Sequence, residues 1–184
     1  MAEADSTAVQ REGQVEEQRV FSPQSVHLLR TAQVNTLTLS QMADQKASIL
    51  IGATFVVFSL AVTRLIGEAI TWSTLSLAAT AFLSSLFAVA SVLPSLGKPP
   101  KDQAMINPLF FGHFAAMEED EWVEFLLDRF ATDEELFRTM LRDIHQNGRV
   151  LYHRKYRFLT LAYRIFLAGI LVTWLIYAAE FTLT

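Results

Sequence analysis

The sequence predicts an all-α membrane protein: three transmembrane helices, with a cytoplasmic helical module formed by an N-terminal helix and the segment between spans two and three. Two observations indicate this class. Apolar residues gather in three long runs, at 47–63, 69–97 and 158–179, and nearly all the charged residues, 18% of the chain, lie outside them. A helix needs roughly 20 apolar residues to cross a bilayer. A soluble core helix can imitate one such run, but three in 184 residues favour membrane insertion.

The composition argues against several classes of protein. The net charge of −4 gives no basic excess for binding nucleic acid, so we expect no nucleic-acid partner. Because the chain has no cysteine, it forms neither a disulfide framework nor a thiolate metal site. The first twenty residues are polar and acidic, so we expect no cleavable signal peptide and assign the membrane address to the internal helices.

The N-terminal part of the chain is predicted to pass from a disordered acidic tail into one long helix. Residues 1–21 offer too little apolar surface to offset the entropy of ordering the chain. Ser22 is a good N-cap and Pro23 suits the first helical position. Since no proline follows for several turns, a cytoplasmic helix at 22–46 can run directly into a first transmembrane helix at 47–66.

Two further spans and a helical module complete the prediction. A polar turn leads into a second transmembrane helix at 69–94, and the third covers 158–181. The segment between them, 98–157, is predicted to be a cytoplasmic helical module. In it, Thr132-Asp133-Glu134-Glu135 forms a capping-box motif, in which Thr132 caps the helix and Glu135 reaches back. Apolar residues then recur near a heptad spacing, so this helix is expected to continue into the third span as a rigid stalk.

Basic residues determine the expected orientation. Four lie before the first span and nine lie between spans two and three, whereas Arg64 stands alone near the first hairpin. We therefore expect the N-terminus and the middle segment to be cytoplasmic. Arg64 and Arg164, at the ends of two spans, are expected to extend their side chains to the headgroups.

Catalysis has little support in the sequence. The four histidines form no metal-binding pair, and neither a nucleophile elbow nor a glycine-rich phosphate loop is present. We therefore expect no enzymatic activity, with no catalytic residue, metal or cofactor. The acidic run at 118–121 could suggest a metal site, but carboxylates solvated at a helix N-terminus explain it better.

Two groups of polar residues are candidates for binding a ligand. Asn35, Asp44 and Lys46 offer an amide, a carboxylate and an ammonium near the bilayer surface; the alternative is simply a solvated edge of the first span. Asp143 and Lys155 lie in an arginine-rich stretch, where a cation could bind a phosphate and Asp143 a hydroxyl or a base edge. A basic segment beside anionic headgroups is the simpler explanation of that stretch.

Two other patterns have more than one reading. The block Asn107-Pro108-Leu109-Phe110-Phe111-Gly112-His113-Phe114 carries more aromatic residues than an exposed loop should. Its rings could pack beneath the helices, which is the default, lie at the membrane surface, or stack on a base. On the second span, a stripe of small residues at i, i+4 spacing suits close helix packing within the chain or self-association; it consists of Ser76, Thr80, Ser84 and Ala88.

At these residues the chain resembles the transmembrane effectors of Pycsar, the bacterial pyrimidine cyclase system for antiphage resistance. Three blocks and the order of the spans carry the resemblance, which covers about residues 30–179. The blocks are Asn35-Thr36-Leu37 through Asp44-Gln45-Lys46-Ala47-Ser48-Ile49-Leu50, then Asn107 to Phe114, then Asp143-Ile144 with Leu151 and Lys155-Tyr156.

The resemblance implies a function that the residues alone do not give. A neighbouring pyrimidine nucleotide cyclase would make cyclic CMP or cyclic UMP during phage infection. The effector, expected to be a homo-oligomer in the bacterial inner membrane, would bind it and impair that membrane, which leads to abortive infection. The alternative is a membrane scaffold or channel subunit without nucleotide binding. The candidate ligand-binding residues are Asn35, Asp44, Lys46, Asn107, Phe111, His113, Asp143, Lys155 and Tyr156.

Overall fold

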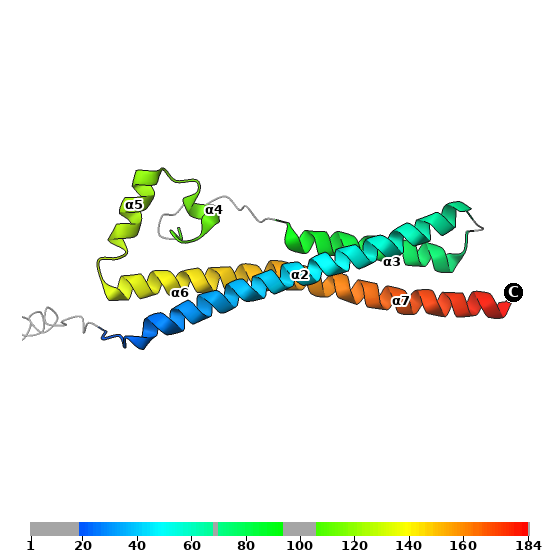
Figure 1. Cartoon of the computed structure of the whole chain (residues 1–184), viewed down its shortest axis with the longest axis horizontal. Coiled ribbons are helices and arrows are strands. Elements are labelled where there is room, and N and C mark those ends of the chain that lie inside the picture. The colour runs from blue at the N-terminus through cyan, green and yellow to red at the C-terminus, as the bar shows by residue number, and fades with distance from the viewer. Residues whose placement is uncertain (1–18, 68–69, 94–105, 184) are drawn as a thin grey trace, which may run out of the picture.

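The computed structural model describes residues 19–67, 70–93 and 106–183, and every regular element in these ranges is a helix (Figure 1). Most of the predicted acidic tail and the beginning of the middle segment lie outside the described residues. In chain order, the elements are α2 (Gln24–Gly67), α3 (Trp72–Val92), α4 (Phe111–Phe114), α5 (Glu119–Asp128), α6 (Asp133–Val150), the π-helical segment η2 (Leu151–Tyr156) and α7 (Arg157–Leu183).

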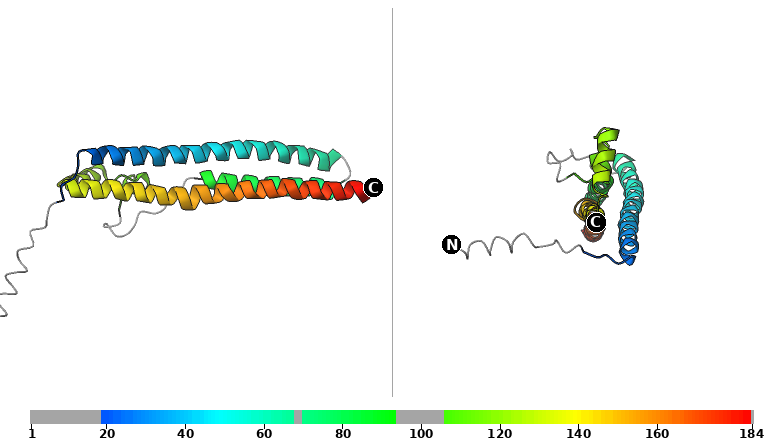
Figure 2. Two further views of the ribbon diagram at one scale, coloured as in Figure 1. Left: turned by 90° about the horizontal axis from the view of Figure 1, so that it is seen from below. Right: turned by 90° about the vertical axis from the view of Figure 1, so that its left-hand side faces the viewer.

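Two long helices form the frame of the molecule. Helix α2 has 44 residues, and α6, η2 and α7 follow one another without a break as a helix of 51 residues. At 1.5 Å per residue they are about 66 Å and about 76 Å long, at least twice the roughly 30 Å of a bilayer core. They point in nearly the same direction (Figure 2) but cross near η2, and α3 packs against both on the side of the spans (Figure 1). Both therefore extend well beyond any membrane that they cross, and we call the end formed by these extensions the polar end.

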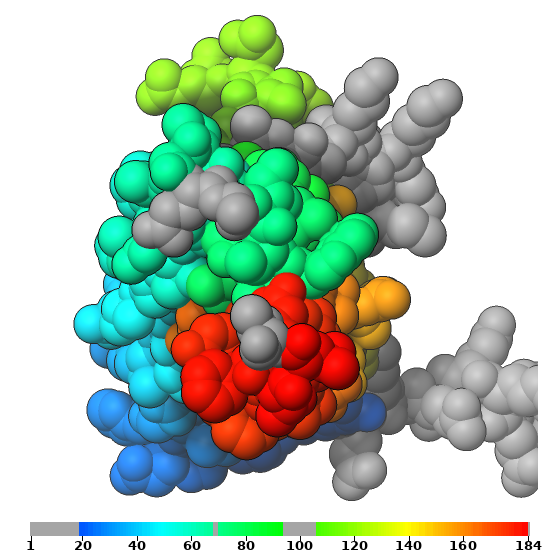
Figure 3. Space-filling view, turned by 90° about the vertical axis from the view of Figure 1, so that its right-hand side faces the viewer, coloured from blue at the N-terminus to red at the C-terminus, as the bar shows by residue number. Residues whose placement is uncertain are grey.

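Three helices are long and apolar enough to span a membrane: α2, α3 and the α7 part of the long helix. This confirms the predicted all-α fold with three transmembrane helices. Helix α3 runs antiparallel to α2 and α7 and packs on both, so that the three lie against one another when the molecule is viewed from its apolar end (Figure 3). The apolar residues that face outward from this bundle are the surface that lipid would cover.

The stripe of small residues on α3 packs against α7 of the same chain. The Ser84 hydroxyl donates a hydrogen bond of 2.8 Å to the carbonyl oxygen of Ala162, and both residues are fully buried. Thr80 lies directly against Gly169, where a Cβ atom would stand only 2.6 Å from the Thr80 hydroxyl oxygen. Of the two alternatives left open by the sequence, the structure therefore shows close packing within one chain.

The far end of the bundle is held by a carboxylate at the N-terminus of α3. Glu180, near the end of α7, accepts hydrogen bonds from the backbone N–H of Trp72 at 2.8 Å and from the hydroxyl of Ser73 at 2.6 Å. The first N–H groups of a helix lack partners within the helix and attract negative charge. Glu180 therefore links the end of the third span to the beginning of the second.

At the polar end, α4, α5 and α6 follow one another along the chain. Helix α6 begins where the capping motif places it, because the Thr132 hydroxyl accepts a hydrogen bond of 3.2 Å from the backbone N–H of Glu135. The aromatic block packs within the module: the Trp122 indole N–H donates to the carbonyl oxygen of Pro108 at 2.8 Å, and its ring lies 5.4 Å from that of Phe114. The acidic run occupies the first turn of α5, where carboxylates favour the helix dipole.

The stalk is continuous, but its register changes at η2. The heptad-like spacing predicts a uniform helix, whereas residues 151–156 form wider π-helical turns. Leu151 and Leu159, on either side of the change, are 8% and 4% exposed, so both remain on the buried face. The wider turns thus bring two helices with different apolar registers onto one packing surface.

Candidate ligand site

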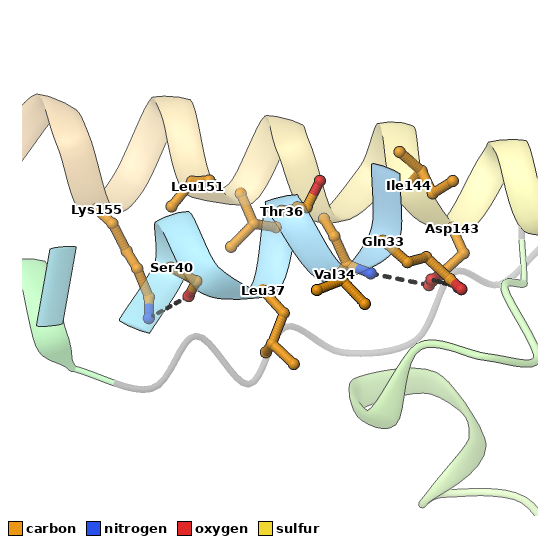
Figure 4. Close-up of a pocket in the computed structure, with 11 residues that line it drawn as sticks. Gln33, Val34, Thr36, Leu37, Ser40, Asp143, Ile144, Leu151 and Lys155 are labelled. Atoms are coloured by element: carbon orange, nitrogen blue, oxygen red, sulfur yellow. Dashed lines mark hydrogen bonds between the residues drawn. The ribbon is translucent and has the colours of Figure 1, made fainter. Parts of the chain in front are cut away.

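A pocket of about 430 Å³ lies between α2 and the helix formed by α6 and η2, at the polar end (Figure 4). This volume falls in the range of roughly 300–1,000 Å³ that is typical of small-molecule sites. Polar and apolar side chains alternate along its walls: Gln33, Val34, Thr36, Leu37 and Ser40 from α2, and Asp143, Ile144, Asn147, Val150, Leu151 and Lys155 from the opposite helix.

A buried carboxylate closes one end of this pocket. Asp143 is only 5% exposed, and three side-chain amides donate hydrogen bonds to it. The donors are Gln33 at 3.2 Å, Asn107 at 3.0 Å and Asn147 at 2.9 Å. A carboxylate away from water is costly unless it is hydrogen-bonded, and three amide donors offset that cost. Asp143 therefore holds together α2, α6 and the segment before α4.

Asn107 attaches that segment to α6. It is 1% exposed, and its amide group donates to both Asp143 and the Gln146 side-chain oxygen, the latter at 3.1 Å. Its side-chain oxygen accepts from the backbone N–H of Leu109 at 3.0 Å, and its own backbone N–H donates to Nδ1 of His113 at 3.0 Å. Burial lowers the pKa of His113 below its ordinary value, which favours the neutral ring that can accept this bond.

A lysine closes the other end of the pocket. Lys155 donates hydrogen bonds to both carboxylate oxygens of Asp44, at 2.8 and 2.6 Å, and to the hydroxyl of Ser40 at 2.8 Å. The neighbouring Tyr156 hydroxyl donates to the carbonyl oxygen of Leu39 at 3.4 Å. These contacts join η2 to α2. Figure 4 shows Lys155 and Asp143 at opposite ends of the pocket.

The structure separates the predicted site residues into three sets. The first set, Asp143 and Lys155, lines the pocket. The second set forms hydrogen bonds to these two residues or to the elements next to them, and it consists of Asp44, Asn107, His113 and Tyr156. The remaining three, Asn35, Lys46 and Phe111, are exposed and lie outside the pocket lining. The Phe111 ring meets the edge of the Phe114 ring at 6.0 Å but remains largely exposed.

Sequence reasoning missed four polar residues of the lining: Gln33, Thr36 and Ser40 on α2, and Asn147 on α6. A signal for three of them was present. Gln33, Thr36 and Ser40 stand at i, i+3 and i+7, and Asp44 continues the series at i+11, so that all four share one helix face. Asn147 follows Asp143 by one turn in the same way.

A second hollow lies on another side of α6 and η2. Its volume is about 420 Å³, and its lining is rich in basic and aromatic groups: Phe110, His113, Gln146, Arg149, Val150, His153 and Arg154. Two guanidinium groups in one hollow favour an anion, since arginine binds phosphate or carboxylate oxygens with two parallel hydrogen bonds. This basic hollow is more open than the pocket between the long helices.

Fold and pocket together define a helical membrane protein with three spans, in which two of the spanning helices extend beyond the bundle and hold a ligand-sized pocket between them. The chain matches the Pycsar effector protein domain over residues 27–180, and it therefore belongs to the family of Pycsar effectors. No curated protein and no solved structure matches the chain. The family match confirms the resemblance found in the sequence, and the family is one of effectors rather than of known enzymes.

Proposed function

We propose that this protein is the effector of a two-gene antiphage system, and that it binds cyclic UMP or cyclic CMP made by a neighbouring pyrimidine nucleotide cyclase. The bound effector then impairs the bacterial inner membrane, which leads to abortive infection. The family supports the effector role. The main support for nucleotide binding is the pocket at the polar end. Its two walls belong to the helices that continue into the first and third spans.

The pocket suits the chemistry of a cyclic nucleotide. Such a ligand carries one negative charge, a ribose hydroxyl and a flat base. The Lys155 ammonium can bind the phosphate, and the Asp143 carboxylate can accept a hydrogen bond from a hydroxyl or from the base edge. Amide and hydroxyl groups between them, such as Asn147 and Thr36, offer further hydrogen bonds, and Leu151 offers an apolar surface for the base.

The ion pair of Lys155 with Asp44 provides a way to couple the ligand to the spans. A phosphate at Lys155 would compete with Asp44 for the same ammonium, and so weaken the contact of η2 with α2. A ligand shifts an equilibrium between two arrangements only if it binds them unequally, and this competition supplies such a difference. Because α2 runs without a break from Asp44 into the first span, a change in its position there would reach the membrane.

The oligomeric state of the protein and its orientation in the membrane are also part of this proposal. The distribution of basic residues favours a cytoplasmic N-terminus and polar end, where a cyclase product would be found. We propose a homo-oligomer as the unit that acts on the membrane. Since the small residues of α3 are already packed on α7, a second copy would have to use another face of the bundle.

Calorimetric titration of the detergent-solubilised protein tests the ligand. We expect cyclic UMP or cyclic CMP to bind and cyclic AMP to bind more weakly. Lys155→Gln should weaken binding about tenfold or more, since a hydrogen bond to a charged group contributes roughly 1.5–3 kcal/mol. Lys46→Gln and Asn35→Ala are the matched controls, because both residues lie on α2 outside the pocket, and their affinities should equal that of the wild type. If neither pyrimidine nucleotide binds the wild type, the scaffold or channel alternative gains the support.

The basic hollow on the other side of α6 is the second candidate location for the same ligand, because it offers two guanidinium groups. The double variant Arg149→Gln/Arg154→Gln separates the two locations. If it abolishes binding while Lys155→Gln does not, the nucleotide occupies the basic hollow, and the pocket between the long helices is not its site.

Dye release from vesicles tests the effect on the membrane. Vesicles that contain the wild-type protein should leak when the nucleotide that binds is added, and not before. Asp44→Asn weakens the hold of α2 on Lys155, so this variant should leak in the absence of nucleotide. An Asp44→Asn protein that stays tight until nucleotide is added would show that the ion pair does not restrain the spans.

A further inference from the structure

A third hollow, of about 530 Å³, lies on the outer face of the stalk where η2 passes into α7. All its lining residues come from this one helix, within three and a half turns: Tyr152, Tyr156, Arg157, Thr160, Leu161 and Arg164. Apart from Tyr156, whose hydroxyl joins η2 to α2, this lining takes no part in the nucleotide proposal. We call it the junction hollow.

Two arginines face the junction hollow without a carboxylate beside them. Arg157 and Arg164 are seven residues apart, which places them on the same face of the helix, and both are exposed. Among residues 19–67, 70–93 and 106–183, no ion pair includes either guanidinium group. The hydroxyl of Thr160, which lies between them along the helix, adds a hydrogen-bond donor to the same surface.

The depth of Arg164 indicates what the counter-anion is. It stands six residues inside the third apolar run, about 9 Å beyond Phe158 along the axis, where a charged group is costly in hydrocarbon. Side chains on a helix tilt toward its N-terminus, which for α7 is the polar end. The guanidinium group of Arg164 is therefore directed back toward Thr160 and Arg157, at the level of the lipid headgroups.

Toward the C-terminus, the same face of α7 carries exposed leucines, and we call this strip the leucine lane. Leu171 and Leu175 follow Arg164 at i+7 and i+11, and they are 60% and 54% exposed. Ala168, between them and the arginine, is small. Cations at headgroup depth above a strip of exposed leucines match the two parts of one phospholipid, an anionic head and an acyl chain.

We propose that the junction hollow binds the phosphate of an anionic phospholipid, with Arg157 and Arg164 on the phosphate oxygens and the acyl chain along Leu171 and Leu175. Guanidinium and phosphate pair through two parallel hydrogen bonds, and the exposed ring of Tyr152 suits the interface beside them. Free phosphate shares the head-group chemistry, but it would leave the leucine lane unused. This site does not depend on nucleotide binding at the polar end.

Native mass spectrometry of the detergent-solubilised full chain tests the proposal, with phosphatidylglycerol, phosphatidylcholine and inorganic phosphate as separate probes. We expect the wild type to retain phosphatidylglycerol in preference to the other two. Arg157→Gln/Arg164→Gln should lower the affinity for phosphatidylglycerol about 30-fold, since each cation near an anionic surface contributes about fivefold. Arg149→Gln/Arg154→Gln removes the same charge outside the junction hollow and should change the affinity less than about threefold.

Three results would overturn the proposal. An equal loss in both double variants would mean general surface electrostatics. Equal retention of phosphatidylcholine would mean that the hollow does not select an anionic lipid. Binding of inorganic phosphate as tight as that of the lipid would mean a site for free anions.

The double variant Arg157→Lys/Arg164→Lys keeps both charges and should bind phosphatidylglycerol better than the glutamine double variant. Helical circular dichroism that is equal in all variants shows that a loss of binding does not come from misfolding.

Discussion

Replacing Asp143 by alanine should release the segment before α4 from the stalk. In the folded protein this carboxylate accepts hydrogen bonds from Gln33, Asn107 and Asn147, which belong to three different parts of the polar end. Alanine removes all three bonds and leaves their donors in place. Gln33 and Asn147 are only half-buried and can turn to water, whereas Asn107 is 1% exposed and keeps only Gln146 as an acceptor for its amide.

The expected loss follows from these contacts. A hydrogen bond to a charged group contributes roughly 1.5–3 kcal/mol, and two of the three donors recover much of that in water. Removing the buried carboxylate also removes its own desolvation cost. What remains is mainly the bond to Asn107, so we expect local opening of this segment to become easier by about 2 kcal/mol. That difference corresponds to a roughly 30-fold faster hydrogen exchange of the amides it protects.

Hydrogen exchange followed by mass spectrometry measures this effect directly. The peptide to follow covers 109–117, where backbone N–H groups such as those of His113 and Phe114 are bonded within the short helix α4. Asp143→Asn retains one acceptor oxygen and should give a smaller increase in exchange rate. Leu141→Ala, at an exposed position of α6, is the control and should leave the exchange rate of this peptide unchanged. The reasoning is refuted if Asp143→Ala leaves the exchange rate of 109–117 at its wild-type value.

Three further predictions concern other contacts. Burial lowers the pKa of His113 below its ordinary value of 6.5, so the folded segment is most stable when this ring is neutral. Protection of 109–117 from hydrogen exchange should therefore fall as the pH drops below 6.5 through the lowered pKa. His113→Gln cannot titrate and should show no such fall. Gly169→Ala should lower the stability of the bundle by about 1–3 kcal/mol in thermal melts, through overpacking against α3, whereas Gly52→Ala, whose Cβ meets nothing within 4 Å, should not. A double-mutant cycle of Asp44→Ala and Lys155→Ala should give a coupling energy of about 0.5–1 kcal/mol, as expected for a partly exposed ion pair; additive single effects would show that the pair contributes nothing to stability.

The existence of the long helices was readable from the sequence because it depends on local patterns. The uninterrupted stretch after Pro23 became one helix through the first span, and the Thr132 cap marked the beginning of the stalk. The sequence did not predict η2. A heptad-like pattern can be satisfied by a uniform helix or by one with a π-helical interruption, and the choice depends on which face must meet α2 and α3.

The candidate site could be predicted only in part, for a related reason. Asp143 and Lys155 stood out because they lie in an arginine-rich stretch that could bind an anion, and because they belong to one of the blocks that carry the family resemblance. Nothing in the linear order indicated that Asp143 would meet Gln33, 110 residues away, or that Asn35 would face outward while its neighbour Thr36 lines the pocket. A step of one residue turns a side chain by about 100° around a helix, so neighbours in sequence can have unrelated environments.

The sequence by itself determined the class of the protein, because three apolar runs with charged flanks have one stable arrangement in a bilayer, with every backbone polar group bonded within a helix. Only the tertiary structure decided how those helices associate. It placed the small residues of α3 against α7 of the same chain, and it brought the extensions of two spans together around one pocket. Such contacts depend on the crossing of helices far apart in the chain, which a local sequence pattern does not encode.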